Sequence, residues 1–317
     1  MKQYWSKSVF RLLSLIIAVT TVISCDEVIP YPDTGATEMM YIEGAIGGGV
    51  SRFSVKRIFP ISEKTFVSQK EKTLLEASMR LTVNGEEVPM TCTNNSLFCY
   101  FSTEYAFQAK DRISVDVSAP GVPDVNCETT VPDLPEVKDV SYNLLDNNTL
   151  DFNATVRIHP EMMDGYAYFL EKEENKVTYI DGVFESETTE TMIQCIQERD
   201  YDSKTIYYRY YPVTGYEDAD TDGMHHLSSN VELSTSYEMP DEEGRIVRTE
   251  STVRRIRFCA WHLSTALYLG LKTKRKNQDY DPDSPLSFVT PLEYSNVTGG
   301  KGYIGTVSTY RSEWRKL

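Results

Sequence analysis

The sequence lacks the short motifs that identify many enzyme families. It contains no G-x-S-x-G, no H-E-x-x-H and no G-x-x-x-x-G-K-[ST], and it has only 4 histidines. These motifs supply a serine nucleophile, a zinc site and a phosphate-binding loop, respectively. Carboxylates are numerous, but the sequence does not reveal whether any two have the separation that a glycoside hydrolase needs. We therefore expect a protein that is not an enzyme.

Paired cysteine motifs and an excess of basic residues are also missing. No C-x-x-C occurs, so zinc-ribbon and thioredoxin-type sites have no support. The net charge is −15, which argues against nucleic acid as a partner because phosphate binding needs a basic face. Residues 245–317 differ, with 13 Lys or Arg against 6 Asp or Glu. This asymmetry indicates either two faces with different partners, or one basic strand and one basic helix end.

A long apolar run is absent after residue 25, and the one before it is short. Lys2, Lys7 and Arg11 precede the apolar segment Leu12–Ile23, which ends in Ser24-Cys25. This segment is shorter than the roughly 20 residues that span a bilayer. The pattern is typical of a lipoprotein signal, in which residues 1–24 are removed and Cys25 becomes acylated. A transmembrane anchor and an ordinary cleaved signal are the alternatives.

The remaining chain is predicted to be mostly β, with two tandem β-sandwich-like domains. Residues 25–37 are rich in Pro, Gly and acidic residues and should form a tether. Short strands with turn signals, such as Asn84-Gly85, predict an N-terminal Ig-like sandwich over 38–135. Two prolines within 132–135 favour a boundary there, before a C-terminal β-rich domain over 136–317.

Two stretches of the second domain have clear periodicity. Apolar residues alternate through Leu150–Ile158, which predicts a half-buried strand. Leu263, Leu267 and Leu271 recur at i+4, and basic residues follow them. Cations near a helix C-terminus complement the helix dipole. We therefore expect one C-terminal α-helix near 263–276.

The cysteines permit disulfides, because an exported protein meets an oxidising compartment. Acylation of Cys25 would leave five of the 6 cysteines. Cys92 and Cys99 flank a polar tetrapeptide that suits a hairpin tip, so they are the best candidate pair. Cys195 and Cys259 are a second candidate pair.

One acidic run resembles a calcium loop. Asp218, Asp220, Asp222 and Gly223 fit D-x-[DN]-x-[DN]-G, in which alternate carboxylates converge on a hard cation. Position twelve of the loop is Ser229 rather than the Glu of an EF-hand. The run is either a calcium site or a solvated acidic loop, and no other cofactor is indicated.

Tyrosine and histidine clusters are expected to be structural. Tyrosines around Arg209 favour packing over glycan stacking. His225-His226 is predicted to lie in a loop, and His262 to cap or pack against the helix.

The C-terminal segment resembles a known family. The matching residues are Arg257-Phe258, Leu263-Ser264, Tyr268, Asp281-Pro282-Asp283, Ser295-Asn296-Val297 and Gly299–Gly305. Glu43-Gly44-Ala45-Ile46 and Thr130-Val131-Pro132 fit the same pattern. Together they resemble the Bacteroidota lipoproteins of domain-of-unknown-function family 4249, although Tyr303 occupies a site that is usually aliphatic.

The resemblance implies an outer-membrane lipoprotein, often encoded near TonB-dependent receptors. We expect a lipid-anchored binding or accessory protein of an envelope nutrient-uptake system, on the periplasmic or cell-surface face. Its expected partners are the membrane, through the lipid, and a TonB-dependent receptor. The alternative is a fimbrillin-like adhesin or pilus-anchor lipoprotein.

Overall fold

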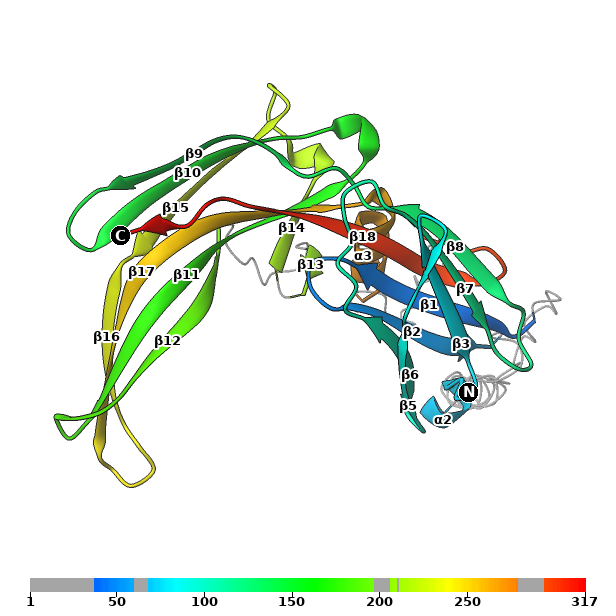
Figure 1. The fold of residues 1–317 in the computed structure, drawn as a ribbon, viewed down its shortest axis with the longest axis horizontal. Helices are drawn as coiled ribbons and strands as arrows, with labels where there is room; N and C mark the ends of the chain where they lie inside the picture. Colours follow the sequence, from blue (N-terminus) through cyan, green and yellow to red (C-terminus); the bar gives the residue numbers. More distant parts are fainter. Residues whose placement is uncertain (1–36, 60–67, 197–205, 210, 279–293) are drawn as a thin grey trace, which may run out of the picture. The chain divides into compact units, whose positions relative to one another are not determined.

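The chain folds almost entirely into β-strands (Figure 1). The computed structural model describes residues 37–59, 68–196, 206–209, 211–278 and 294–317. All elements below belong to the compact unit formed by Glu38–Ile58 and Val67–Leu317. Its strands form a large sheet of 12 strands and two smaller sheets of 4 and 3 strands. The predicted mostly β fold with a C-terminal helix is confirmed.

The first sandwich packs part of the large sheet against the four-stranded sheet. Its strands are β1 (Met39–Ile46), β2 (Ser51–Ile58), β3 (Ser78–Val83), β4 (Glu86–Val88), β5 (Thr91–Asn95), β6 (Phe98–Thr103), β7 (Arg112–Ser118) and β8 (Val125–Thr130), with helix α2 (Gln69–Lys72) before β3. Alternate apolar side chains point inward, and Phe53, Leu81 and Val115 belong to one buried core. The predicted turn joins β3 to β4, with φ of 52° at Asn84 and 90° at Gly85.

The last long strand, β18 (Lys301–Arg311), links the two ends of the chain. It pairs in parallel with β1, where Gly302 lies opposite Ile42. Further along, it pairs antiparallel with β17 (Ile246–Leu263). A C-terminal strand therefore belongs to the sheet that builds the first sandwich (Figure 1). The division into domains 38–135 and 136–317 stays a prediction, and β18 would be shared between them.

The second sandwich packs the three-stranded sheet against β17 and its neighbour β11. The three strands are β9 (Glu136–Leu144), β10 (Thr149–Arg157) and β15 (Met224–Glu232), and β11 is Gly165–Ile180. The alternating apolar residues of 150–158 all lie in this core, as predicted. Phe152 contacts Phe258 of β17, with ring centroids 5.3 Å apart.

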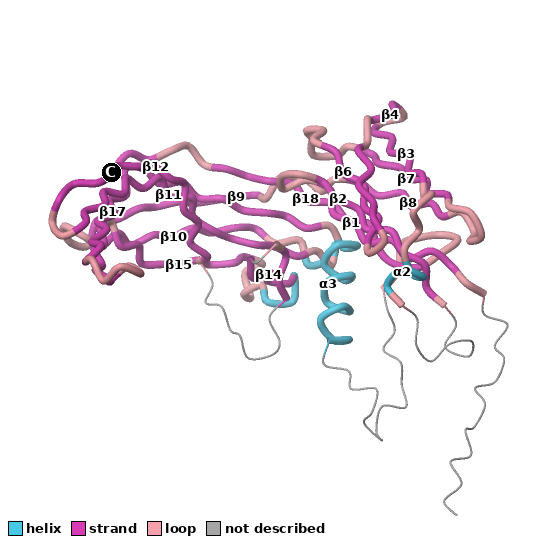
Figure 2. Tube along the Cα trace, turned by 90° about the horizontal axis from the view of Figure 1, so that it is seen from below, coloured by secondary structure: helices cyan, strands magenta, loops and turns pink. Residues whose placement is uncertain are grey.

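Helix α3 (Thr265–Gln278) packs against β18, with its first turn two residues after the predicted start. Figure 2 shows it as the longest helical segment among the strands. The contact is close because glycine occurs on both elements. A Cβ on Gly270 would lie 2.4 Å from Tyr303, and one on Gly305 would lie 2.3 Å from the Leu267 Cβ.

The remaining elements extend the large sheet. They are β12 (Val183–Cys195), β13 (Ile206–Tyr208), β14 (Tyr211–Gly215), β16 (Ser234–Pro240) and β19 (Arg315–Lys316), with 3-10 helices at Pro160–Met162 and Tyr216–Asp218. Strand β12 pairs with β11, and β16 pairs with β17.

The basic C-terminal segment finds its partners within the chain. Arg255 and Arg257 of β17 pair with Glu173 and Glu171 of β11. Two helix lysines, Lys272 and Lys274, pair with Glu217 and Glu43. The charge asymmetry therefore arises from one basic strand and one basic helix that meet acidic residues from earlier in the chain.

Two sequence-based predictions are wrong. His225 and His226 lie in β15, because the turn before it ends at Gly223 and residue 225 already pairs with Val156 of β10. Cys195 and Cys259 flank Phe169 on opposite sides. They are two strand spacings apart, roughly 9–10 Å, which exceeds the ~7 Å limit for the Cα atoms of a disulfide.

Candidate functional site

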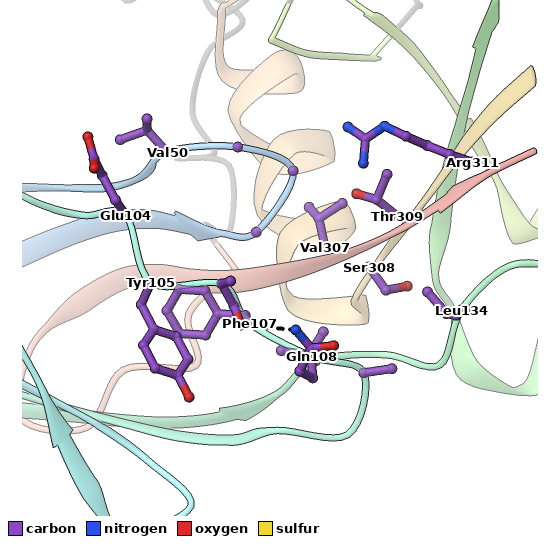
Figure 3. Close-up of a pocket in the computed structure, with 16 residues that line it drawn as sticks. Val50, Glu104, Tyr105, Phe107, Gln108, Leu134, Val307, Ser308, Thr309 and Arg311 are labelled. Atoms are coloured by element: carbon purple, nitrogen blue, oxygen red, sulfur yellow. Dashed lines mark hydrogen bonds between the residues drawn. The ribbon is translucent and has the colours of Figure 1, made fainter. Parts of the chain in front are cut away.

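The main candidate site is a cleft of about 680 Å³ beside β18. Three remote segments line it: the β1–β2 turn, the loop 104–109, and residues 307–311 of β18. Figure 3 shows Tyr105, Phe107 and Gln108 on one side of β18 and the turn that ends at Val50 on the other. Small-molecule sites in proteins typically measure about 300–1,000 Å³, so the cleft has the size of a ligand site.

The glycine turn on one side of the cleft is fixed by hydrogen bonds. Gly47, Gly48 and Gly49 all have positive φ, which side-chain-bearing residues rarely adopt. The Arg209 guanidinium donates to the carbonyls of Gly48 at 2.6 Å and Val50 at 2.5 Å. Arg209, from a distant segment, therefore holds the shape of this turn.

The 104–109 loop presents an aromatic pair on the other side. Tyr105 and Phe107 pack edge to face with ring centroids 4.9 Å apart, and Tyr105 is 44% exposed. The loop is anchored by its backbone, since the Gln108 N–H donates to the Asp111 carboxylate at 2.7 Å. An exposed tyrosine on an anchored loop offers an apolar face and a hydroxyl to a ligand.

The cleft mixes polar and apolar groups and carries little charge. Among its described lining residues only Glu104 and Arg311 are charged, and none is His or Cys. The Arg311 Nε lies 3.5 Å from a Glu171 oxygen, so the charge of this guanidinium is partly balanced by a carboxylate of β11. Such a lining suits recognition of a polar molecule that also has an apolar or aromatic face.

A serine, a histidine and an aspartate meet at the wall of this cleft. Ser308, which lines the cleft, is the cross-strand partner of His262, and the His262 Nε2 lies 2.7 Å from Asp164 Oδ2. The Ser308 hydroxyl donates to the Asp133 carbonyl at 2.7 Å, and His262 Nδ1 lies 2.8 Å from the same oxygen. Because a carbonyl only accepts hydrogen bonds, Nδ1 carries a hydrogen and does not accept the serine proton.

This arrangement differs from a catalytic triad, in which the second histidine nitrogen accepts the serine proton. All three side chains are buried. Thr265 of helix α3 also donates to Asp164, at 2.7 Å. The geometry therefore fastens the segment around Asp133 to β17, β18 and the start of α3.

Neither the protein-family models nor the curated proteins matched this chain. The resemblance to family 4249 therefore stays a prediction. Cys25, the predicted lipidation site, lies outside the described residues, as do the tether to residue 36 and Asp281-Pro282-Asp283. Among the described helices, none is both long and apolar enough to cross a membrane.

Two of the three carboxylates of the predicted calcium loop have separate hydrogen-bond partners. Asp218 accepts from the Gly215 N–H at 3.0 Å. Asp222 accepts from the Met224 N–H at 3.0 Å and lies 2.9 Å from His226 Nε2. Across the described residues, no group of three His, Cys, Asp or Glu side chains is placed to hold a metal ion. Calcium binding through Asp218, Asp220 and Asp222 stays a prediction.

Cys92 and Cys99 lie on one face of the β5–β6 hairpin as free thiols. Cys92 is opposite Phe101 and Cys99 is opposite Asn94, so the two cysteines are diagonal neighbours. Diagonal residues are roughly 7–8 Å apart, which is wider than most disulfides allow. Burial raises the pKa of the Cys99 thiol to about 11. The disulfide stays a prediction.

The sequence did not identify the lining of the cleft. Its residues come from positions near 48, 106 and 309, which the pairings of β1 with β18 and of β2 with β6 bring together. The available local signals were the glycine run and the aromatic residues of 105–107. Of the tyrosines around Arg209, Tyr208 is buried against Trp261, which agrees with a packing role.

Proposed function

We propose that this chain is a lipid-anchored outer-membrane protein that binds a small polar nutrient and passes it to an envelope uptake system. The cleft beside β18 carries the binding part of this proposal. The lipoprotein-like segment that ends at Cys25 carries the location. A TonB-dependent receptor is the proposed partner, and the chain contributes binding rather than chemistry.

Binding is favoured over catalysis by the residues of the cleft. An exposed Tyr105, a glutamine and a threonine offer stacking and hydrogen bonding, whereas the adjacent Ser308 and His262 donate to one carbonyl. The ligand class that fits is an uncharged or zwitterionic molecule with an apolar or aromatic face. The anchored loop and turn would hold the site largely preformed, which reduces the ordering cost of binding.

The location is tested by metabolic labelling with palmitate and fractionation of the envelope. We expect label on the wild type, loss of label in Cys25→Ser, and release of that variant from the outer membrane. Cys92→Ser is the matched control, because it also removes one thiol but should keep the label. Equal labelling of wild type and Cys25→Ser would contradict lipidation at this residue.

The binding role is tested on protein extracted gently from its own membrane. Native mass spectrometry should reveal a bound small molecule that is lost in Tyr105→Ala and Arg311→Ala. Tyr237→Ala, which changes a tyrosine 51% exposed on β16, should keep it. Absence of any bound molecule from all four proteins would count against the cleft.

The partner is tested by crosslinking in intact cells. Recovery of a large β-barrel receptor with the wild type supports the uptake role. Ladders on unboiled, non-reducing gels would instead favour the pilus-anchor alternative, since pilins polymerise by strand addition.

A further inference from the structure

Strand β12 is a long edge strand. It runs over 13 residues, Val183–Cys195, and among the described residues it pairs only with β11. Figure 1 shows no labelled strand on its outer side. Residues 183–193 are all exposed. Such an edge presents a row of backbone N–H and C=O groups that another strand can use.

Two devices that commonly protect an edge, proline and lysine, are absent from β12. Proteins commonly place proline or lysine there, or cover the edge with another segment. Strand β16 ends in Pro240, and the edge of β8 is covered by Thr298, which exchanges backbone hydrogen bonds with Asn126 at 2.9 and 3.0 Å. Strand β12 contains no Pro, Lys or Arg. Its one bulge, at Glu185, leaves residues 186–193 as a regular ladder.

The side chains of β12 have an apolar–acidic–apolar order. Glu185, Glu187 and Glu190 occupy its middle. Phe184, Met192 and Ile193 lie toward its two ends and are 57%, 38% and 45% exposed. Two of the carboxylates contact β11, since Asn175 donates to Glu187 and Lys176 to Glu190, both at 2.7 Å. The edge still has two more negative than positive charges, which favours a basic strand beside it.

We propose that β12 is a docking edge to which a partner protein adds one extended strand, basic in its middle and apolar at its ends. Backbone hydrogen bonds would supply affinity, and the three glutamates would select the partner by charge. A second copy of this chain fits poorly, because two β12 edges would bring glutamates together. The proposal is independent of the cleft and of the lipid, so its failure would not affect them.

Peptide binding to the full-length protein in detergent tests the charge requirement. The probe is a fluorescent peptide as long as β12, with alternating Thr and Val at its ends and alternating Thr and Lys in its middle. We expect it to bind at least about tenfold more tightly than the same peptide with Glu in place of Lys. The variant Glu185→Lys/Glu187→Lys/Glu190→Lys should reverse this preference. Equal affinity of both peptides would overturn the proposal.

Two proline variants test the use of the backbone edge. Successive N–H groups of a strand point to opposite sides, so Thr188→Pro and Thr189→Pro remove one N–H toward β11 and one toward the open edge. The edge-facing variant should keep the wild-type unfolding midpoint and lose peptide binding, whereas the other should lose stability too. Retained peptide binding in both variants would overturn the proposal. The proposal would also be overturned if the chain formed a dimer and either proline disrupted that dimer.

Discussion

His225 and His226 are adjacent in the chain, but their side chains lie on opposite faces of β15. His225 is 5% exposed, and its Nδ1 lies 2.7 Å from the Tyr168 hydroxyl. The exposed His226 has its Nε2 2.9 Å from a carboxylate oxygen of Asp222. Burial lowers the pKa of His225, whereas the hydrogen bond with Asp222 raises the pKa of His226.

The pKa of His226 should lie above the ordinary histidine value of about 6.5, and the pKa of His225 should lie below it. The raised pKa of His226 stabilises the fold below about 6.5, and this contribution is lost as pH rises through its folded pKa. The lowered pKa of His225 stabilises the fold above about 6.5, and this contribution is lost as pH falls toward its folded pKa. NMR titration of both rings measures this, and Asp222→Asn should return only His226 to its ordinary value. Shifts of the same sign would contradict the strand placement.

Calcium, if it binds residues 218–223, should compete with His226 for Asp222. We expect millimolar calcium to raise the unfolding temperature and to lower the pKa of His226, because the carboxylate would turn to the cation. Asp220→Ala should abolish both effects, and Asp116→Ala, on a distant strand, should abolish neither. Differential scanning fluorimetry and the same NMR titration measure them. No response to calcium would leave the run as a solvated acidic loop.

Local sequence patterns predicted individual strands and the helix, but they did not predict which distant strands pair. Alternation over 150–158 and the i+4 leucines of 263–271 identified β10 and α3, because one buried face imposes a period on the sequence. The parallel pairing of β18 with β1 joins residues about 260 positions apart, and no periodicity encodes it. The cleft depends on that pairing and was missed with it. His225 was misplaced because the acidic glycine turn before it favoured a loop.

Asp164 and His262 should act as one unit in stability. Both are buried, and removal of either partner leaves a polar group with no substitute for a 2.7 Å hydrogen bond. Asp164→Ala and His262→Ala should each lower the free energy of unfolding by about 3–5 kcal/mol, as for a broken buried pair. The double variant should cost less than the sum of the two. Urea unfolding measures this, with His159→Ala, whose side chain is 41% exposed, as a control expected within about 0.5 kcal/mol of the wild type.

The same unfolding measurements test whether Asp164 and His262 anchor the segment around Asp133. If both single variants left stability unchanged, the segment around Asp133 would need another anchor. The hydrogen bond from Thr306 Oγ1 to the Thr130 carbonyl, at 2.7 Å, is the next candidate. In that case Thr306→Val should lower the free energy of unfolding, whereas His262→Ala does not.

Gly270→Ala should destabilise the protein, although alanine is normally the better helix residue. In an exposed helix interior, replacing glycine by alanine gains about 1 kcal/mol. Here the new Cβ would lie 2.4–2.6 Å from three ring carbons of Tyr303. Gly270 and Tyr303 are both buried, so we expect a net loss of about 1–3 kcal/mol in the free energy of unfolding. Lys276→Ala, at an exposed position of the same helix, should stay within about 0.5 kcal/mol of the wild type. A stabilised Gly270→Ala variant would contradict the close contact between α3 and β18.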